Sequence, residues 1–218
     1  MKHLRITAFL TQGFSAAYEW ALSIDGIVGY AKKMNELGFD DFVYSQSSNN
    51  MKPLDDLPFQ KEHFLDMWWY KCSMPIFKIE STQDKHLFRR FNTFEAETML
   101  QNVKKVETTK GAYRNAMISK TFFITKKVDW FVIGDKEEIE KYLKMITHIG
   151  GARRAGFGAV SKWEVVEVEE NSKPRLYRPL PIEFAERNNV TGLYVNWAIR
   201  PPATISVNKF DCVIPRND

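Results

Sequence analysis

The feature that most constrains this chain is a short glycine-rich loop with two adjacent arginines at its centre. Its residues are Gly150, Gly151, Ala152, Arg153, Arg154, Ala155, Gly156, Phe157 and Gly158. Glycine permits positive φ and lets a ligand approach the backbone closely. Successive backbone N–H groups can then surround an anion, and guanidinium groups match the geometry of phosphate oxygens. The loop is predicted to bind an anion or, as the alternative, to end a helix at Gly150 and turn.

The elements that flank the loop exclude the common nucleotide-binding motifs. A helix is predicted for residues 135–148, because Asp135 and Glu138 form a capping-box pattern at its start. A strand is predicted for residues 157–166. Phosphate loops of the Walker and Rossmann types run from a strand into a helix. This loop runs from a helix into a strand, so it is not a nucleotide-cofactor fingerprint.

Apolar patterning places the loop in an α+β chain. Helices are predicted at residues 25–37 and 135–148, and strands at residues 4–10, 64–74, 76–79, 118–124, 128–133, 157–166, 193–197 and 210–214. Up to residue 166 this is a decorated β-α-β-β-α-β order, which predicts a ferredoxin-like or RRM-like domain. Such a sheet leaves one face free for RNA. We expect a single domain over residues 1–218, with a hairpin-like excursion at residues 80–116 and a C-terminal strand extension at residues 170–218.

The net charge of +4 over 218 residues says little by itself, but the charge is unevenly distributed. Between residues 101 and 127 one acid, Glu107, stands against seven basic residues: Lys104, Lys105, Lys110, Arg114, Lys120, Lys126 and Lys127. Aromatic residues make up 14% of the chain, so we expect some of them at the surface, for stacking or for interfaces. A basic stretch with aromatics nearby suits a polyanion. The alternative is the solvated surface of a hairpin.

Several other classes of protein are disfavoured. The two cysteines, Cys72 and Cys212, have no metal-site spacing, and no His or Cys pair stands at ligand spacing, so no metal or cofactor is expected. The chain also lacks the Gly-x-Ser-x-Gly motif of a serine nucleophile. Its first residues contain no apolar signal region, and no apolar run is long enough to span a bilayer. We expect a cytoplasmic protein with reduced cysteines.

Further motifs join the glycine loop in a pattern that resembles a known family. The loop is similar to the C-terminal glycine-rich loop of the CRISPR-associated RAMP proteins. Residues 23–31 resemble the entry to the first helix of the type IV subunit, and Gly-Ala-Tyr-Arg at residues 111–114 resembles the tip of its excursion. Ile-Arg-Pro-Pro at residues 199–202, followed by Cys-Val-Ile-Pro at residues 212–215, resembles its C-terminal end. The combination, from near residue 20 to the end, points to the type IV member of the "Cas five" group.

The resemblance implies a RAMP fold and a structural role. Members of this group cap the five-prime handle of the CRISPR RNA (crRNA) in antiviral ribonucleoprotein complexes, and they are usually not nucleases. Their thumb hairpin contacts the RNA and the first backbone subunit, of the "Cas seven" group. A large subunit, target DNA and, in some complexes, a helicase are further partners. The RNA-facing positions carried over are Gly150, Gly151, Arg153, Arg154, Gly156, Phe157 and Gly158 in the loop, and Arg89, Arg90, Lys104, Lys105, Lys110, Tyr113 and Arg114 in the thumb.

Two alternatives remain open from the residues. One is a metal-independent endoribonuclease that processes the crRNA, with His148 beside the loop as base or acid and Tyr113 or a lysine as its partner. A histidine at that position is also explained by the dipole of a helix C-terminus. The other alternative is a protein-interaction module on a ferredoxin-like scaffold, because a fold does not dictate a function.

Overall fold

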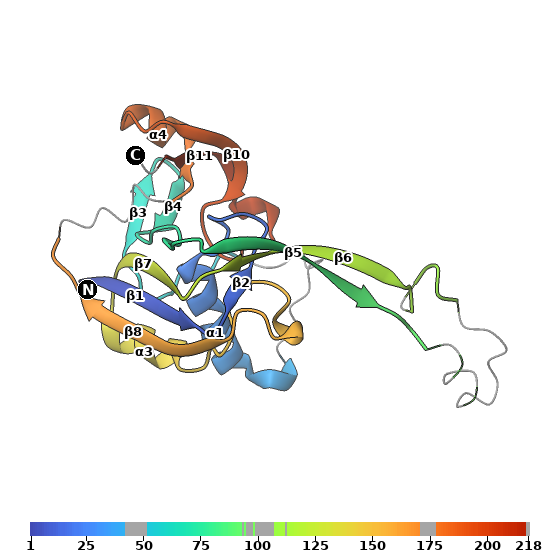
Figure 1. Cartoon of the computed structure of the whole chain (residues 1–218). Helices are drawn as coiled ribbons and strands as arrows, with labels where there is room; N and C mark the ends of the chain where they lie inside the picture. Colours follow the sequence, from blue (N-terminus) through green and yellow to red (C-terminus); the bar gives the residue numbers. More distant parts are fainter. Residues whose placement is uncertain are drawn as a thin grey trace.

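Three antiparallel strands form the sheet around which the body of the molecule is built (Figure 1). They are β1 (Lys2–Leu10), β7 (Lys127–Gly134) and β8 (Val160–Glu167), in the order β7-β1-β8. The alternation predicted for the first strand is confirmed, since Leu4, Ile6 and Ala8 are fully buried. The computed structural model describes residues 1–41, 52–92, 94, 98, 107–111, 113–170 and 178–216, and this part of the chain is an α+β structure with antiparallel sheets.

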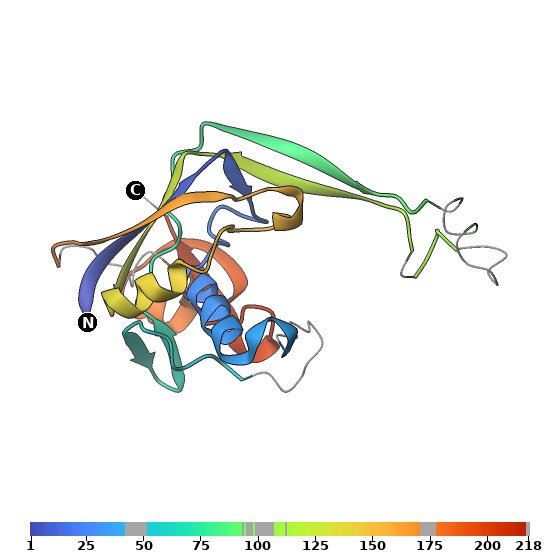
Figure 2. The same cartoon turned by 90° about the horizontal axis from the view of Figure 1, so that it is seen from below.

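Two helices cover one face of this sheet, α1 (Ile24–Asp41) and α3 (Lys136–Leu143) (Figure 2). Ile24 and Val28 of α1 and Ile139 of α3 are fully buried in the same core as β1. The side chain of Asp135 caps α3 by accepting a hydrogen bond from the N–H of Glu138 at 3.0 Å. The capping pattern read from the sequence is therefore confirmed.

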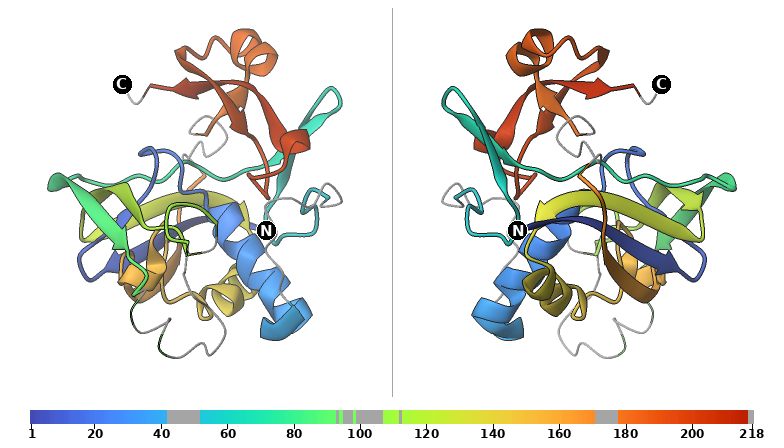
Figure 3. Two further views of the ribbon diagram at one scale, coloured as in Figure 1. Left: turned by 90° about the vertical axis from the view of Figure 1, so that its right-hand side faces the viewer. Right: turned by 90° about the vertical axis from the view of Figure 1, so that its left-hand side faces the viewer.

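A smaller unit at the C-terminal end of the chain lies against the body (Figure 3). Its sheet has the order β10-β11-β9, from β9 (Leu180–Pro181), β10 (Gly192–Ala198) and β11 (Lys209–Pro215), with α4 (Ile182–Arg187) beside it. The hairpin of β3 (Lys61–Phe64) and β4 (Met67–Tyr70) contributes Trp69 to its apolar core. The predicted strands at residues 193–197 and 210–214 are confirmed as the antiparallel pair β10 and β11.

A buried ion pair joins the C-terminal unit to the body. Arg178 precedes β9 and lies 3.4 Å from the carboxylate of Asp25, in the first turn of α1. Arg178 also donates hydrogen bonds to the carbonyl oxygens of Tyr70 and Ile199. Removing one member of a buried pair leaves an uncompensated charge, so this contact fixes how the two units meet.

A two-stranded ribbon projects from the body (Figure 1). It consists of β5 (Ser81–Arg89) and β6 (Ala116–Ile124), which pair along their whole length from Ser81–Ile124 to Arg89–Ala116. The short strand β2 (Gly13–Ser15) pairs with the inner end of β6 only. Strand β5 lies within the range expected for the excursion, residues 80–116, and β6 begins at the end of that range and continues to Ile124.

The structure differs from the sequence-based expectations at five places. Residues 76–79, predicted as a strand, make only an isolated bridge between Ile76 and Asp129. The strand predicted at residues 64–74 is divided by a turn at Leu65, whose φ is 51°. The first helix ends at Gly38 as predicted, with φ 75° and ψ 170°, but a second helical segment that was not predicted follows the kink and extends α1 to Asp41. Helix α3 ends at Leu143 rather than at residue 148. Helix α4 was not expected, because Pro181 directly precedes it in a connector that holds several prolines.

Candidate nucleic-acid interface

The glycine loop is the tip of a tight hairpin, not the continuation of a helix. After α3 ends, the N–H of Ile149 donates to the carbonyl of Gly158 at 2.9 Å, and the N–H of Val160 donates to the carbonyl of Thr147 at 2.8 Å. The interpretation of Gly150 as a helix cap is therefore wrong. Five residues lie between Gly150 and Gly156, and the turn within them is a 3-10 helix, Arg153–Ala155.

Backbone hydrogen bonds to strand β2 hold the loop against the body. The N–H of Gly151 donates to the carbonyl of Ser15 at 2.6 Å, and the N–H of Gly158 donates to the carbonyl of Gly13 at 3.0 Å. A Cβ on Gly158 would lie 1.8 Å from the carbonyl oxygen of Ile149, at a φ of 75°. Glycine is required there by the close approach of two backbone segments. The N–H groups of Gly151 and Gly158 are thus occupied by protein acceptors, and the anion-binding capacity of the loop rests on its other groups.

The two arginines of the loop have different surroundings. The guanidinium carbon of Arg153 lies 5.0 Å from the centre of the Tyr30 ring in α1, a cation–π contact. Arg154 is exposed. Arg153 lines the groove described below, while Arg154 is not among the residues of its wall. The sequence analysis assigned both arginines to RNA binding, but only Arg153 lies in the wall of the groove.

A groove with a volume of about 1180 Å³ brings the loop together with distant parts of the chain. Its wall includes Gly150, Gly151 and Arg153 of the loop, parts of α1, the middle of β6 at residues 119–121, residues 52–56 and residues 201–203. Pockets for small molecules usually measure about 300–1,000 Å³. The groove is therefore large enough for more than one nucleotide.

The groove carries an excess of positive charge. Four basic side chains line it, from Lys33, Lys52, Lys120 and Arg153, against two carboxylates, from Asp55 and Asp56. The carboxylate of Asp56 is paired with Lys32 at 2.6 Å, and the hydrogen bond to that ammonium group lowers the pKa of Asp56. Lys33 is likewise held by Glu36 at 2.6 Å. Lys120 of β6 and Arg153 of the loop both belong to the wall of the groove.

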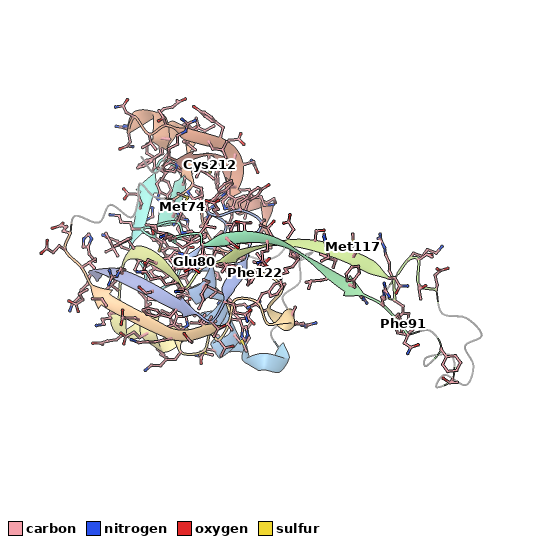
Figure 4. The ribbon with its side chains drawn as sticks, viewed as in Figure 1. Met74, Glu80, Phe91, Met117, Phe122 and Cys212 are labelled. Atoms are coloured by element: carbon pink, nitrogen blue, oxygen red, sulfur yellow. The ribbon has the colours of Figure 1, made fainter. Side chains whose placement is uncertain are left out.

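Phe157 connects the loop to the base of the ribbon. Its ring centre lies 4.7 Å from that of Phe122 in β6. Phe157 was expected to face RNA, and the structure shows its ring packed against the ring of Phe122. Figure 4 shows Phe122 near the body, so the contact fixes the loop at the inner end of the ribbon.

The thumb positions lie far from the loop, at the outer end of the ribbon. Figure 4 shows Phe91 there, and the ring of Tyr113 lies 4.5 Å from that of Phe91. Arg89 ends β5, Arg90 lies over the ring of Phe88, and Lys110 and Arg114 belong to the same outer end. Phe122 lies six positions along β6 from Ala116, or roughly 20 Å of strand. Lys104 and Lys105 lie outside the described residues. The predicted site residues therefore fall into two groups.

One of the two partners proposed for a nuclease, Tyr113, does not lie near His148, whereas a lysine, Lys120, lines the same groove. His148 itself lines the groove, and its Nδ1 lies 3.0 Å from the hydroxyl of Thr147. Tyr113 is at the outer end of the ribbon, so the pairing of His148 with Tyr113 is wrong. His148 also lies five residues beyond the end of α3, which removes the helix-dipole explanation for its position.

Sequence reasoning missed the contributions of α1 and of residues 201–203 to the groove. Tyr30 and Lys33 are spaced as part of an ordinary amphipathic helix, and nothing in the local pattern shows that this face meets residue 153. Lys120 was counted in a basic stretch, but its place in a groove wall follows from the pairing of β6 with β2. Among the described residues, no three His, Cys, Asp or Glu side chains are grouped as a metal site, and no helix is long and apolar enough to cross a membrane.

Comparison with known proteins identifies the family. The family model described as CRISPR type IV associated protein Csf3 matches residues 2–206, nearly the whole chain. No curated protein matches the chain. The resemblance inferred from the glycine loop, the entry to α1 and residues 199–202 is confirmed at the level of the family. The chain belongs to the Csf3 family of CRISPR type IV associated proteins.

Proposed function

We propose that this protein is a non-catalytic RNA-binding subunit that caps the five-prime handle of the crRNA in a type IV ribonucleoprotein complex. The observation that carries the proposal is the basic groove, in which the glycine loop, α1 and the base of the ribbon meet around Arg153. Its size and its charge suit a short stretch of single-stranded RNA. Membership of a CRISPR-associated family makes crRNA the RNA to expect.

The arrangement of the body supports a ferredoxin-like, RAMP-type core. The strands follow the order β8-β1-β7, and Cys72 and Ile76 form bridges to Val132 and Asp129 on the outer edge of β7. Numbered in chain order, β1 is strand 1, the segment at residues 72–76 is strand 2, β7 is strand 3 and β8 is strand 4. The spatial order is then 4-1-3-2 with α1 and α3 on one face, which is the pattern of a β-α-β-β-α-β unit. On this reading residues 1–218 are one decorated domain, the ribbon is its thumb, and residues 170–218 are an extension.

Phosphate binding falls mainly to side chains. Arg153 and Lys120 supply fixed charge at the loop side of the groove, and each phosphate contact releases counterions when RNA binds. Affinity is therefore expected to fall as salt rises. Gly150 contributes by keeping the loop close to β2, because a Cβ there would lie 2.5 Å from the carbonyl oxygen of Ser15. The glycines thus hold the arginine turn at the rim of the groove.

The ribbon has the properties of an arm that contacts neighbouring subunits. Phe88 and Met117 are paired across its strands and are 63% and 62% exposed, although both are apolar. Arg89, Arg90 and Arg114 add positive charge at the same end. We assign to this end the contact with the first "Cas seven" backbone subunit and with the RNA that it holds. The large subunit, target DNA and a helicase remain further expected partners.

A gel shift with the repeat-derived handle RNA tests the proposal. The double variant Arg153→Ala/Arg154→Ala is expected to bind more weakly than the wild type at moderate salt. Lys209→Ala, an exposed lysine on β11 away from the groove, is the matched control and should bind normally. Unchanged affinity of the double variant would remove the loop from the interface.

Two further measurements separate the proposal from its alternatives. The purified protein, incubated with repeat RNA without metal, is expected to leave the RNA intact, and cleavage that is lost in His148→Ala would establish the endoribonuclease instead. A protein-interaction module would purify free of nucleic acid. We expect the protein isolated from its complex to carry RNA, seen as a raised ratio of absorbance at 260 nm to that at 280 nm.

A further inference from the structure

Three aromatic rings from two distant parts of the chain form one cluster at the surface. Tyr18 and Trp20 are stacked, with ring centres 4.6 Å apart and planes 5° apart. Trp197 of β10 meets both rings edge-on, at 5.9 Å from Tyr18 and 6.5 Å from Trp20. We call Tyr18, Trp20 and Trp197 the aromatic platform. Its parts come from the loop before α1 and from the C-terminal unit, so the fold assembles it.

The platform belongs to neither apolar core. The core of the body and the core of the C-terminal unit are both built from other residues. Tyr18 is 50% exposed, so its outer face is open to solvent. Rings that pack for stability are buried, whereas rings held open in a rigid arrangement are typical of surfaces that receive another molecule.

The platform adjoins the groove that holds the glycine loop. A smaller cavity of about 50 Å³ lies beside Trp20 and Trp197. Its wall and the wall of the groove have five residues in common: Ala21, Ser23, Gly26, Pro201 and Ala203. The groove and the two tryptophans of the platform are therefore neighbours in the fold.

Two hydrogen-bond donors in the wall of the smaller cavity lack an acceptor within the described part of the chain. They are Nε1 of Trp20 and Nε of Arg178, and Arg178 is 4% exposed. Buried polar groups in folded proteins almost always have a hydrogen-bond partner. Both donor atoms are buried, and the cavity of about 50 Å³ has room for a water molecule but not for a nucleotide. The case for a ligand on the platform therefore rests on the exposed ring of Tyr18 and on the groove that adjoins it.

We propose that an unpaired nucleobase of the RNA in the groove stacks on the exposed face of Tyr18, so that the aromatic platform extends the RNA interface beyond the glycine loop. This inference rests on the proposed function. The charge of the adjoining groove favours a polyanion as the occupant, because four basic side chains line it against two acids. Stacking on a ring tolerates any base, since every base has a π-face.

Binding of the repeat-derived handle RNA to platform variants of the full chain tests this. Tyr18→Ala and Tyr18→Leu both remove the π-face, and the second keeps most of the apolar volume. Each is expected to weaken binding by roughly 5- to 100-fold. Tyr18→Phe should bind like the wild type. Tyr194→Ala is the matched control, because Tyr194 lies on the same strand as Trp197, is 66% exposed and is outside the platform.

The salt dependence distinguishes stacking from charge contacts. The slope of log affinity against log salt should be unchanged in Tyr18→Leu and shallower by about 0.7 in Arg153→Ala, which loses one phosphate contact. Normal binding by both Tyr18→Ala and Tyr18→Leu, with weakened binding by Arg153→Ala, would overturn the platform and leave the proposed function standing. Absence of RNA binding by the wild type would overturn both. Normal RNA binding by the Tyr18 variants with loss of a protein subunit from the complex would reassign the platform to a protein partner.

Discussion

The guanidinium carbon of Arg153 lies 5.0 Å from the centre of the Tyr30 ring, and this contact joins the glycine loop to α1 across one end of the groove. The two residues are 123 positions apart in the chain. The cation–π contact restrains the guanidinium over the Tyr30 ring, in the wall of the groove. The arginine is thereby oriented before any RNA arrives.

This contact predicts that charge alone does not replace Arg153. In Arg153→Lys the positive charge remains, but the planar group that stacks on Tyr30 is lost. RNA affinity should fall by a few-fold while the salt slope stays like that of the wild type, because the number of phosphate contacts is preserved. Titrations at several salt concentrations measure both quantities. A Lys variant with wild-type affinity would show that the stacked orientation has no role.

The backbone contacts of the glycine loop predict a sharp difference between two of its glycines. Gly158→Ala should lower the free energy of unfolding by at least about 3 kcal/mol, because the new Cβ would collide with the carbonyl of Ile149 at 1.8 Å. Gly156→Ala is the matched control. Gly156 also has a positive φ, 83°, but no heavy atom lies within 4 Å of its Cβ position, so the cost should be about 1–2 kcal/mol. Urea unfolding of both variants measures the difference, and equal costs would contradict the geometry of the hairpin.

Replacing the exposed pair Phe88 and Met117 should weaken assembly of the complex without lowering the stability of the protein. Phe88→Ser/Met117→Ser should leave the melting temperature within about 2 °C of the wild type, because neither side chain is buried. The same variant should lose its association with the backbone subunit in a pull-down. Leu193→Ser, which removes an exposed leucine from β10, should keep that association. Retained assembly by the ribbon variant would place the subunit contact elsewhere.

The buried cysteines predict a loss of stability in alkali. Burial raises the pKa of the Cys212 thiol from 9.0 to about 12, and it also raises the pKa of Cys72. Between pH 9.0 and 12 the unfolded chain therefore binds fewer protons at these thiols than the folded chain. The free energy of unfolding should fall as the pH rises through this range. Cys212→Ala should show a shallower fall in urea unfolding series, and an unchanged dependence on pH would mean that the thiol is not shielded.

The rate of reaction with a thiol reagent tests independently whether the two cysteines are buried. At pH 8 both cysteines should react slowly in the folded protein and at once in denaturant, because the thiolate is the reactive species. Rapid reaction of either cysteine in the folded chain would contradict its buried position.

Local patterns were sufficient for the elements that depend on local interactions. The alternation of β1 and the cap of α3 at Asp135 were predicted because each is encoded within a few residues. The turn at Leu65 was missed because a left-handed leucine is uncommon and is fixed here by the pairing of β3 with β4. The end of α3 was placed five residues late, because Ile146 and Ile149 continue the apolar pattern without being helical.

The candidate site was predicted in part. The glycine loop was found because its composition is unusual, and the family resemblance grew from it. The separation of the loop from the thumb residues could not be predicted, since it depends on how far the ribbon extends before it turns. The groove itself depends on contacts between residues more than a hundred positions apart, such as Tyr30 and Arg153. No local pattern encodes such contacts.

Photocrosslinking tests the central claim most directly. The handle RNA is synthesised with 4-thiouridine at successive positions, bound to the full chain and irradiated, and the crosslinked peptides are identified by mass spectrometry. The account predicts crosslinks within residues 148–158 and residues 119–121, because both segments line the groove. Crosslinks confined to other surfaces, with these two segments unmodified at every labelled position, would contradict it.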